Sequence, residues 1–188
     1  MDNQYLDSVI KQFEYYKMLG DKTFTQLCDE QLFYQFNSES NSIAILVNHM
    51  AGNMLSRWTD FLTTDGEKDW RHRDLEFENS IQTKAELLAK WNQGWNCLFN
   101  AITPLTKNDL ATEIFIRNQG HSVVEAINRQ LAHYSYHVGQ IAFLGKMLTN
   151  EKWSSLSIPK GNSTEYNSEK FSKEKSTEHF TSEYLNKK

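Results

Sequence analysis

Four long segments of this chain repeat apolar residues every three to four positions, which is the period of an α-helix with one buried face. The segments cover residues 2–27, 42–62, 84–102 and 123–148. Sustained alternation of apolar and polar residues is absent from the sequence, and only residues 113–116 (EIFI) suggest a short extended piece. Amphipathic helices of this kind bury their apolar faces against one another. The sequence therefore predicts an all-α fold built as a four-helix bundle.

Local signals support the limits of the last two helices. Thr83 with Glu86, and Ser122 with Glu125, have the spacing of a capping box, in which a hydroxyl and a carboxylate satisfy each other's backbone amides. Pro104 follows the third segment and ends its helical pattern. These signals predict helices that begin just after Thr83 and Ser122.

The chain changes character near residue 150. Polar residues dominate after residue 160, and the composition past Tyr166 is typical of a disordered segment. We therefore divide the chain into a bundle of residues 1–150 and a C-terminal extension of residues 151–188. The expected anchors of the extension, on the bundle or on a partner subunit, are its large apolar side chains: Phe171, Phe180, Tyr184 and Leu185.

Composition excludes several classes of function. The net charge of −4 argues against nucleic acid as a partner, because a duplex attracts a basic surface. No run approaches the ~18 apolar residues that span a bilayer, and the first residues lack the basic-then-apolar order of a signal peptide. The two cysteines, Cys28 and Cys97, are too few for a disulfide framework. We expect a cytoplasmic protein with no nucleic-acid partner and no membrane association.

The strongest functional signal is a pair of histidines, His133 and His137, one helical turn apart in the fourth segment. Residues at this spacing lie on one face of a helix and can hold one metal ion together. His49, in the second segment, can complete a three-nitrogen site. On helical projections all three lie at the border of the buried face, where a fourth metal position stays open to water. The alternative is a set of surface histidines that are solvated or hydrogen-bonded and bind no metal.

The residues near these histidines include candidates for a substrate pocket but no suitably placed carboxylate. The nearest carboxylate on the face of His49 is Asp60, roughly 16 Å along the helix axis, so no general base is expected at the obvious positions. Asn53 and Arg57 follow His49 on its own side of the helix, and they are the expected substrate-pocket residues, with Arg57 suited to an anionic group. The other histidines have no neighbours at ligand spacing and are expected at the surface: His72, His121 and His179.

Small residues follow a second face of the fourth segment, and they let another helix approach closely, within the monomer or across a dimer. The face comprises Ala132, Ser135, Gly139 and Ala142.

Four strings of residues resemble a known family. They are residues 41–50 (NSIAILVNHM), 65–78 (DGEKDWRHRDLEFE), 130–141 (QLAHYSYHVGQI) and 155–163 (SLSIPKGNS). Together they resemble the DinB superfamily of four-helix metal-binding proteins, which includes the YfiT-like metal-dependent hydrolases. Within that superfamily the chain is most similar to a bacterial branch of unassigned function, and the resemblance covers nearly the whole chain.

The resemblance implies an up-and-down bundle of unusual connectivity that is often dimeric. It implies a divalent metal held by one histidine of the second helix and two of the fourth, which correspond here to His49, His133 and His137. Relatives include transferases and isomerases that use a low-molecular-weight thiol such as bacillithiol or mycothiol. The resemblance, the small-residue face and the aromatic anchors of the extension together lead us to expect a homodimer.

Two functions follow from these observations. The first is a divalent-metal-dependent enzyme with a small-molecule substrate, either thiol transferase-like or hydrolase-like, whose metal is nickel or zinc because imidazole suits both. The missing carboxylate base favours the thiol reaction slightly. The second is a non-catalytic stress or interaction protein, in which a metal closed off by a fourth protein ligand is structural or sensory.

Overall fold

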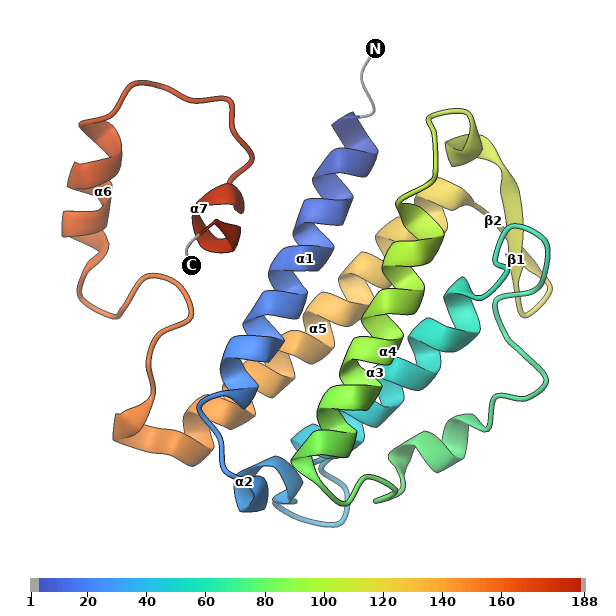
Figure 1. Ribbon diagram of the computed structural model, residues 1–188, viewed down its shortest axis with the longest axis horizontal. Coiled ribbons are helices and arrows are strands. Elements are labelled where there is room, and N and C mark those ends of the chain that lie inside the picture. Colours follow the sequence, from blue (N-terminus) through green and yellow to red (C-terminus); the bar gives the residue numbers. More distant parts are fainter. Residues whose placement is uncertain (1–3, 187–188) are drawn as a thin grey trace.

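The computed structural model describes residues 4–186, and it shows an all-α fold with one small hairpin (Figure 1). The helices are α1 (Gln4–Phe24), α2 (Asp29–Phe33), α3 (Ile43–Trp58), α4 (Lys84–Ile102), α5 (Val123–Thr149), α6 (Ser163–Phe171) and α7 (Ser182–Leu185). Short 3-10 turns and strands complete it: η1 (Arg73–Phe77), η2 (Asp109–Ala111), η3 (Asn150–Lys152), β1 (Glu113–Ile116) and β2 (Gln119–Ser122). No helix in this part of the chain is both long and apolar enough to cross a bilayer.

The bundle consists of α1, α3, α4 and α5. Helix α1 packs mainly on α5, α3 packs mainly on α4, and α3 also contacts α5. Helices α3 and α4 run in the same direction in Figure 1, because the segment between Trp58 and Lys84 returns the chain along the bundle. This long crossover passes over α3 through η1, which packs on that helix.

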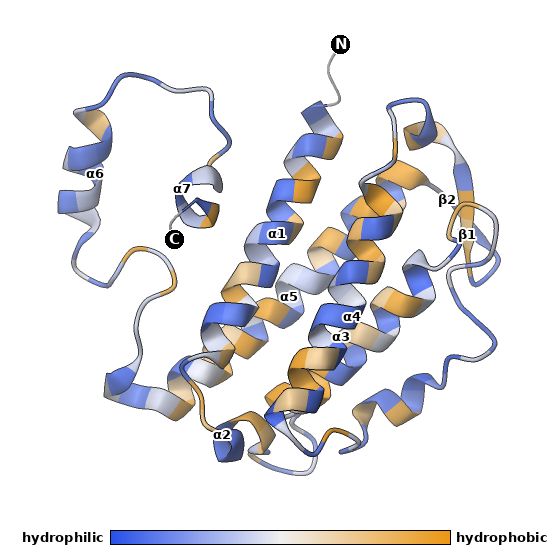
Figure 2. Cartoon of the chain, in the orientation of Figure 1, coloured by the Kyte–Doolittle hydropathy of each residue, from blue (hydrophilic) through white to orange (hydrophobic). Residues whose placement is uncertain are grey.

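Aromatic side chains fill the centre of the bundle. The ring of Phe13 on α1 lies 6.2 Å from that of Trp95 on α4 and 6.1 Å from that of Tyr134 on α5, measured between centroids. All three side chains are fully buried, and burying a ring of this size stabilises a fold by roughly 1.5–3 kcal/mol. In Figure 2, α1 carries its apolar residues along the side that faces the other bundle helices. The apolar faces of the four helices thus pack together into one core.

The predicted helix limits hold best where capping signals were present. Helix α4 begins after Thr83, whose side chain accepts from the amide of Glu86, and α5 begins after Ser122 with the full capping box. The predicted box at Thr83 is wrong in its second half, because the Glu86 carboxylate accepts from the amide of Gln82 instead. Helix α3 ends at Trp58 and not at residue 62, because the backbone turns into a left-handed conformation at Asp60 (φ 47°).

The structure also differs from the first predicted helix and confirms the predicted extended piece. Helix α1 ends at Phe24, three residues before the expected limit, and its expected start at residue 2 lies outside the described residues. The extended piece at residues 113–116 is confirmed as β1, which pairs with β2 in an antiparallel hairpin. Between the two strands, Arg117 and Asn118 both have positive φ (56° and 59°), which is the two-residue turn that matches strand twist.

The C-terminal extension is more ordered than its composition predicts. It forms α6 and α7, and α7 packs on α1, where the ring of Tyr15 contacts those of Phe180 and Tyr184. The side chain of His179 is hydrogen-bonded to Ser8 on the same helix. Phe171 is 86% exposed, so its expected role as an anchor within this chain is wrong. The domain division at residue 150 stays a prediction.

The contact between α3 and α4 generates a prediction about stability. A Cβ at Gly94 of α4 would lie 2.9 Å from the backbone of Ala51 and 3.0 Å from the sulfur of Met54, so Gly94→Ala must push the two helices apart. Overpacking of this kind costs about 1–3 kcal/mol, which exceeds the roughly 1 kcal/mol that alanine gains over glycine in a helix. We expect urea unfolding to show a lower free energy of unfolding for this variant.

Asn92→Ala is the control, since Asn92 is exposed on α4 and its replacement raises helix propensity without adding an atom to the contact with α3. This variant should be as stable as the wild type or more stable. Equal gains in both variants would contradict the close approach of α3 and α4.

Candidate metal centre

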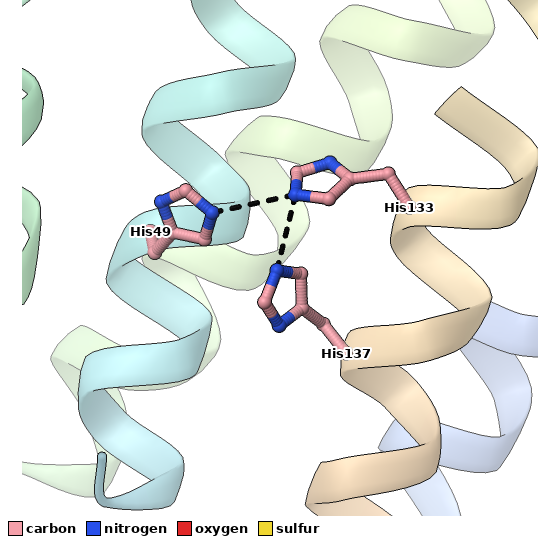
Figure 3. A group of neighbouring side chains, drawn as sticks. All are labelled: His49, His133 and His137. Atoms are coloured by element: carbon pink, nitrogen blue, oxygen red, sulfur yellow. Dashed lines mark hydrogen bonds between the residues drawn. The ribbon is translucent and has the colours of Figure 1, made fainter. Parts of the chain in front are cut away.

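Three histidines from two neighbouring helices meet at one side of the bundle. His49 lies on α3, and His133 and His137 lie one turn apart on α5. Figure 3 shows the ring of His49 reaching across from α3 toward the two rings from α5. One ligand atom from each residue lies within 4.8 Å of the other two. The predicted clustering of these histidines is confirmed, whereas metal binding by them stays a prediction.

The spacing of the ring nitrogens matches that of metal ligands. The Nε2 atoms of His133 and His137 are 3.0 Å apart, and those of His133 and His49 are 3.4 Å apart. Nitrogens held at 2.0–2.1 Å from a tetrahedral zinc ion are separated by about 3.3–3.4 Å. Two of the three nitrogen pairs therefore lie near the spacing that such an ion requires, and the third pair lies within 4.8 Å.

Hydrogen bonds at the far side of two rings fix which nitrogen carries the proton. The Nδ1 atom of His49 donates to the Glu76 carboxylate (2.9 Å), and the Nδ1 atom of His137 donates to Oε1 of Gln140 (2.8 Å). A neutral imidazole with its proton on Nδ1 has a lone pair on Nε2. His133 has one Nε2 proton at most and can satisfy only one of the two lone pairs that face it. A cation between the three nitrogens satisfies all of them, which is the arrangement expected of metal-binding histidines.

Glu76 is the functional residue that the sequence pattern missed. It comes from η1 in the long crossover, 27 residues after His49, and its carboxylate is buried. Arg71 donates to both of its oxygens, through Nε (2.7 Å) and Nη2 (2.9 Å). The expectation of no general base at the obvious positions concerned the helix face of His49, whereas Glu76 reaches the ring from a different element. Glu76 orients the ring, and its oxygens are already engaged by His49 and Arg71.

The local electrostatics keep the Glu76 carboxylate ionised and the imidazoles of His133 and His137 neutral. Burial alone would raise the pKa of Glu76, but the hydrogen bonds from His49 and Arg71 and the charge of Arg71 outweigh it and lower that pKa. Burial, together with the neighbouring histidines and arginines, lowers the pKa of His133 to about 3. The pKa of His137 is also lowered, mainly by burial. The rings are thus free to act as ligands near neutral pH, because a ligand imidazole must be unprotonated.

A cavity of about 260 Å³ opens beside two of the three histidines. Its lining residues are His49, Asn53, Arg57, Arg71, Arg73, Arg117, Arg129, Gln130 and His133. The two residues predicted for the substrate pocket, Asn53 and Arg57, thus border the same cavity as His49 and His133, although their role in binding a substrate stays a prediction.

Both predicted pocket residues already have partners within the protein. Asn53 accepts from the hydroxyl of Tyr134 (3.0 Å), and Arg57 donates to the Glu67 carboxylate (2.9 Å) and to the carbonyl of Gly66. Burial lowers the pKa of Arg57, which remains charged. These contacts hold both side chains in fixed positions at the wall of the cavity.

The remaining histidines lie outside the cluster, as predicted. His72 is exposed, His121 is hydrogen-bonded to Arg129 near the hairpin, and His179 contacts α1.

The low pKa of His133 generates a prediction about the metal-free protein. Its stability should fall as the pH drops below about 6.5, because the unfolded chain protonates His133 at an ordinary pKa of 6.5 and the folded protein does so only at about 3. Between these values the unfolded state binds more protons. The loss is at most about 1.4 kcal/mol per pH unit, and it is smaller because the ring is partly exposed.

Urea unfolding of EDTA-treated protein at several pH values between about 7.5 and 5 measures this loss. His133→Asn should lose stability less steeply than the wild type over this range, since carboxylates titrate equally in both. An identical slope in both proteins would contradict the buried, neutral state of His133.

A known protein family matches the part of the chain that contains the bundle and the clustered histidines. The family described as "Protein of unknown function (DUF1572)" matches residues 1–162, which include the four bundle helices and all three clustered histidines. No curated protein and no solved structure matches the chain. Since the match covers most of its length, the chain belongs to the DUF1572 family of proteins of unknown function.

Proposed function

We propose that this protein is a divalent-metal-dependent enzyme in which His49, His133 and His137 hold one nickel or zinc ion. The observation that carries the proposal is the convergence of three Nε2 atoms at ligand spacing, with the proton of two rings fixed on Nδ1. The resemblance of the chain to the DinB superfamily supports the same ligand set. Imidazole nitrogen suits both metals, so the donor set does not distinguish them.

The number of ligands favours a catalytic ion over a structural one. The group found among the described residues contains three histidines and no fourth His, Cys, Asp or Glu. Structural zinc sites have four protein ligands, whereas catalytic sites keep one position for water or substrate. The cavity beside His49 and His133 gives a small molecule access to that side of the cluster. A fourth protein ligand would favour the alternative, a non-catalytic metal-binding stress or interaction protein, and the group found in this part of the chain contains none.

We place thiol transfer ahead of hydrolysis. A bound zinc-type ion lowers the pKa of a thiol or water in its open position toward neutrality. Hydrolysis gains further from a carboxylate base, and none of the described residues that line the cavity is a carboxylate. Glu76 is engaged by His49 and Arg71. The substrate we propose is therefore a small molecule that reacts with a low-molecular-weight thiol.

Metal content after dialysis tests the proposal directly. Untagged protein dialysed against zinc or nickel should retain about one ion per chain, because three imidazoles converge on one point. Single changes of His49, His133 or His137 to Ala should each lower the metal content sharply. Glu76→Gln should keep the three ligands but weaken binding by about 10–100-fold, since it removes the charge that supports His49.

His72→Ala is the matched control, because His72 is an exposed histidine outside the cluster, and it should leave metal content unchanged. Unchanged occupancy after replacement of all three clustered histidines would refute the proposal. A screen for S-conjugation with low-molecular-weight thiols, on protein of known metal content, then separates thiol transfer from hydrolysis.

We also propose that the protein is a homodimer through the outer face of α5. The small residues Ala132 and Gly139 lie exposed on this face. Three large apolar side chains lie exposed on the same helix, at spacings of seven and four residues: Tyr136, Phe143 and Met147. Exposed apolar side chains clustered on one helix are typical of an interaction surface.

Phe143→Glu should shift the protein toward a monomer of about half the mass in sedimentation experiments, because it puts a charge into an apolar contact. Phe36→Glu is the matched control, since Phe36 is also exposed and lies between α2 and α3, outside α5 and the extension. A wild-type protein that sediments as a monomer of 22.0 kDa at all concentrations would contradict the dimer.

A further inference from the structure

Every arginine of this chain borders one cavity. The five arginines are Arg57, Arg71, Arg73, Arg117 and Arg129, and all of them line the cavity beside His49 and His133. None of the described lysines does so, although lysine makes up the other 15 of the 20 basic residues. The chain as a whole carries a net charge of −4. The cavity therefore concentrates positive charge of one chemical kind in an otherwise acidic protein.

Two of these arginines are matched by internal carboxylates. Arg57 and Arg71 both donate to Glu67, and Arg71 also binds Glu76 through two hydrogen bonds. Both guanidinium groups are buried, with 6% and 2% of the side chain exposed. These two arginines and two glutamates form a network of charges that builds the wall of the cavity.

The other three arginines are exposed and less completely matched. Arg117 shares the Glu67 carboxylate (3.2 Å) with the two buried arginines. Arg73 has a contact of 3.8 Å with Asp74, whose carboxylate is fully exposed and therefore screened by water. Arg129 is hydrogen-bonded to a ring nitrogen of His121 and not to a carboxylate.

Separate elements of the fold direct these three side chains to the same cavity. Arg73 lies over the ring of Phe77 (5.0 Å), and that ring stacks on His49 at a centroid distance of 4.7 Å. Arg129 precedes His133 by one turn on α5. Arg117 lies in the tight turn between β1 and β2.

The turn that carries Arg117 is fixed to the crossover by Asp65. Its carboxylate accepts from the backbone amides of Arg117 and Asn118, both at 2.8 Å, and the amide of Gly66 donates to the carbonyl of Phe115 (2.8 Å). Asp65 adds a negative charge here, but the five arginines still outnumber Asp65, Glu67 and Glu76. The hairpin thus holds a positive charge at the rim of the cavity with its backbone already ordered.

Guanidinium groups bind carboxylates and phosphates through paired hydrogen bonds, which lysine does not offer. A volume of about 260 Å³ lies near the lower end of the range for ligand pockets. We propose that the substrate of the metal centre is a small molecule with at least two anionic groups, carboxylate or phosphate, bound by Arg73, Arg117 and Arg129. This inference rests on the proposed function, because it places the reacting group of that molecule at His49, His133 and His137.

Three two-carbon thiols whose terminal groups differ in charge test the inference, because each binds the metal through its sulfur and presents its terminal group to the arginines. The probes are 2-mercaptoethanesulfonate, 2-mercaptoethanol and cysteamine, and the readout is the visible spectrum of protein loaded with Co²⁺. The anionic thiol should bind at least about tenfold more tightly than the neutral one, and the cationic thiol most weakly, since a hydrogen bond to a charged group discriminates by about this factor. Equal affinity for all three thiols would overturn the inference.

Substitution of the exposed arginines separates their effect from that of the metal. Arg73→Gln, Arg117→Gln and Arg129→Gln should each weaken binding of the anionic thiol by about tenfold and leave that of 2-mercaptoethanol unchanged. Lys90→Gln removes the same charge from an exposed site on α4 and is the matched control. Loss of affinity for the neutral thiol as well would show a structural effect and count against a role in anion binding.

Competition by simple anions identifies the groups that are recognised. Succinate should displace the anionic thiol at lower concentration than acetate does, because it offers two carboxylates, and inorganic phosphate tests the alternative anion. Equal competition by succinate and acetate would contradict a substrate with two anionic groups.

The two proposals fail in different ways. If the protein binds no Co²⁺, the proposed function is wrong, and stabilisation of metal-free protein against unfolding by succinate or phosphate then tests the arginine cavity alone. If Co²⁺ binds and the thiols show no preference for negative charge, the metal centre stands and the anionic substrate is wrong.

Discussion

The site depends on one buried chain of charged and polar groups, in which Arg71 holds Glu76 and Glu76 holds His49. The Arg71 side chain is 2% exposed and that of Glu76 is 9% exposed. Removing either partner leaves an uncompensated buried charge, which costs far more than the pair itself contributes. Because Arg71 and Glu76 both lie in the crossover, the contact between Glu76 and His49 is the one that fixes the crossover on α3. It also sets the ring orientation of His49, and through it the geometry of the cluster.

Residues of α3 near His49 allow the crossover to pack closely against this helix. A Cβ at Gly52 would collide with the carboxylate of Glu76, so glycine permits the close approach one turn after His49. Asn48 donates to the backbone carbonyl of Glu76 (3.0 Å), and Phe77 stacks on the ring of His49. The backbone, carboxylate and neighbouring ring of one short segment are all fixed to a single turn of α3. These contacts hold the irregular connection in one position against α3.

The sequence predicted those features that depend on local periodicity and failed for those that depend on distant contacts. Helices α4 and α5 were predicted within a residue because their caps and apolar faces are encoded in contiguous residues. The clustered histidines were likewise recognisable from a spacing of four on α5 and from the border position of His49. Glu76 was missed because its contact with His49 arises from the path of the crossover, which has no periodic signal. The order of the C-terminal extension was missed because it rests on aromatic contacts between α7 and Tyr15 of α1.

Helices and loops contribute different parts of the site. The three histidines lie on helices whose positions the core determines, whereas Arg73 and Arg117 lie on the crossover and on the hairpin. Loops on a rigid scaffold tolerate change, so charges at the rim can vary in evolution without disturbing the ligand geometry. Burial, the neighbouring histidines, and the buried Arg57 and Arg71 lower the pKa of His133. Arg73 and Arg117 at the rim favour the anionic form of any acidic group that enters the cavity. The arginines therefore act on both halves of the site, because the buried pair adds to the effect of burial on His133 and the exposed ones attract a negatively charged molecule toward the histidines.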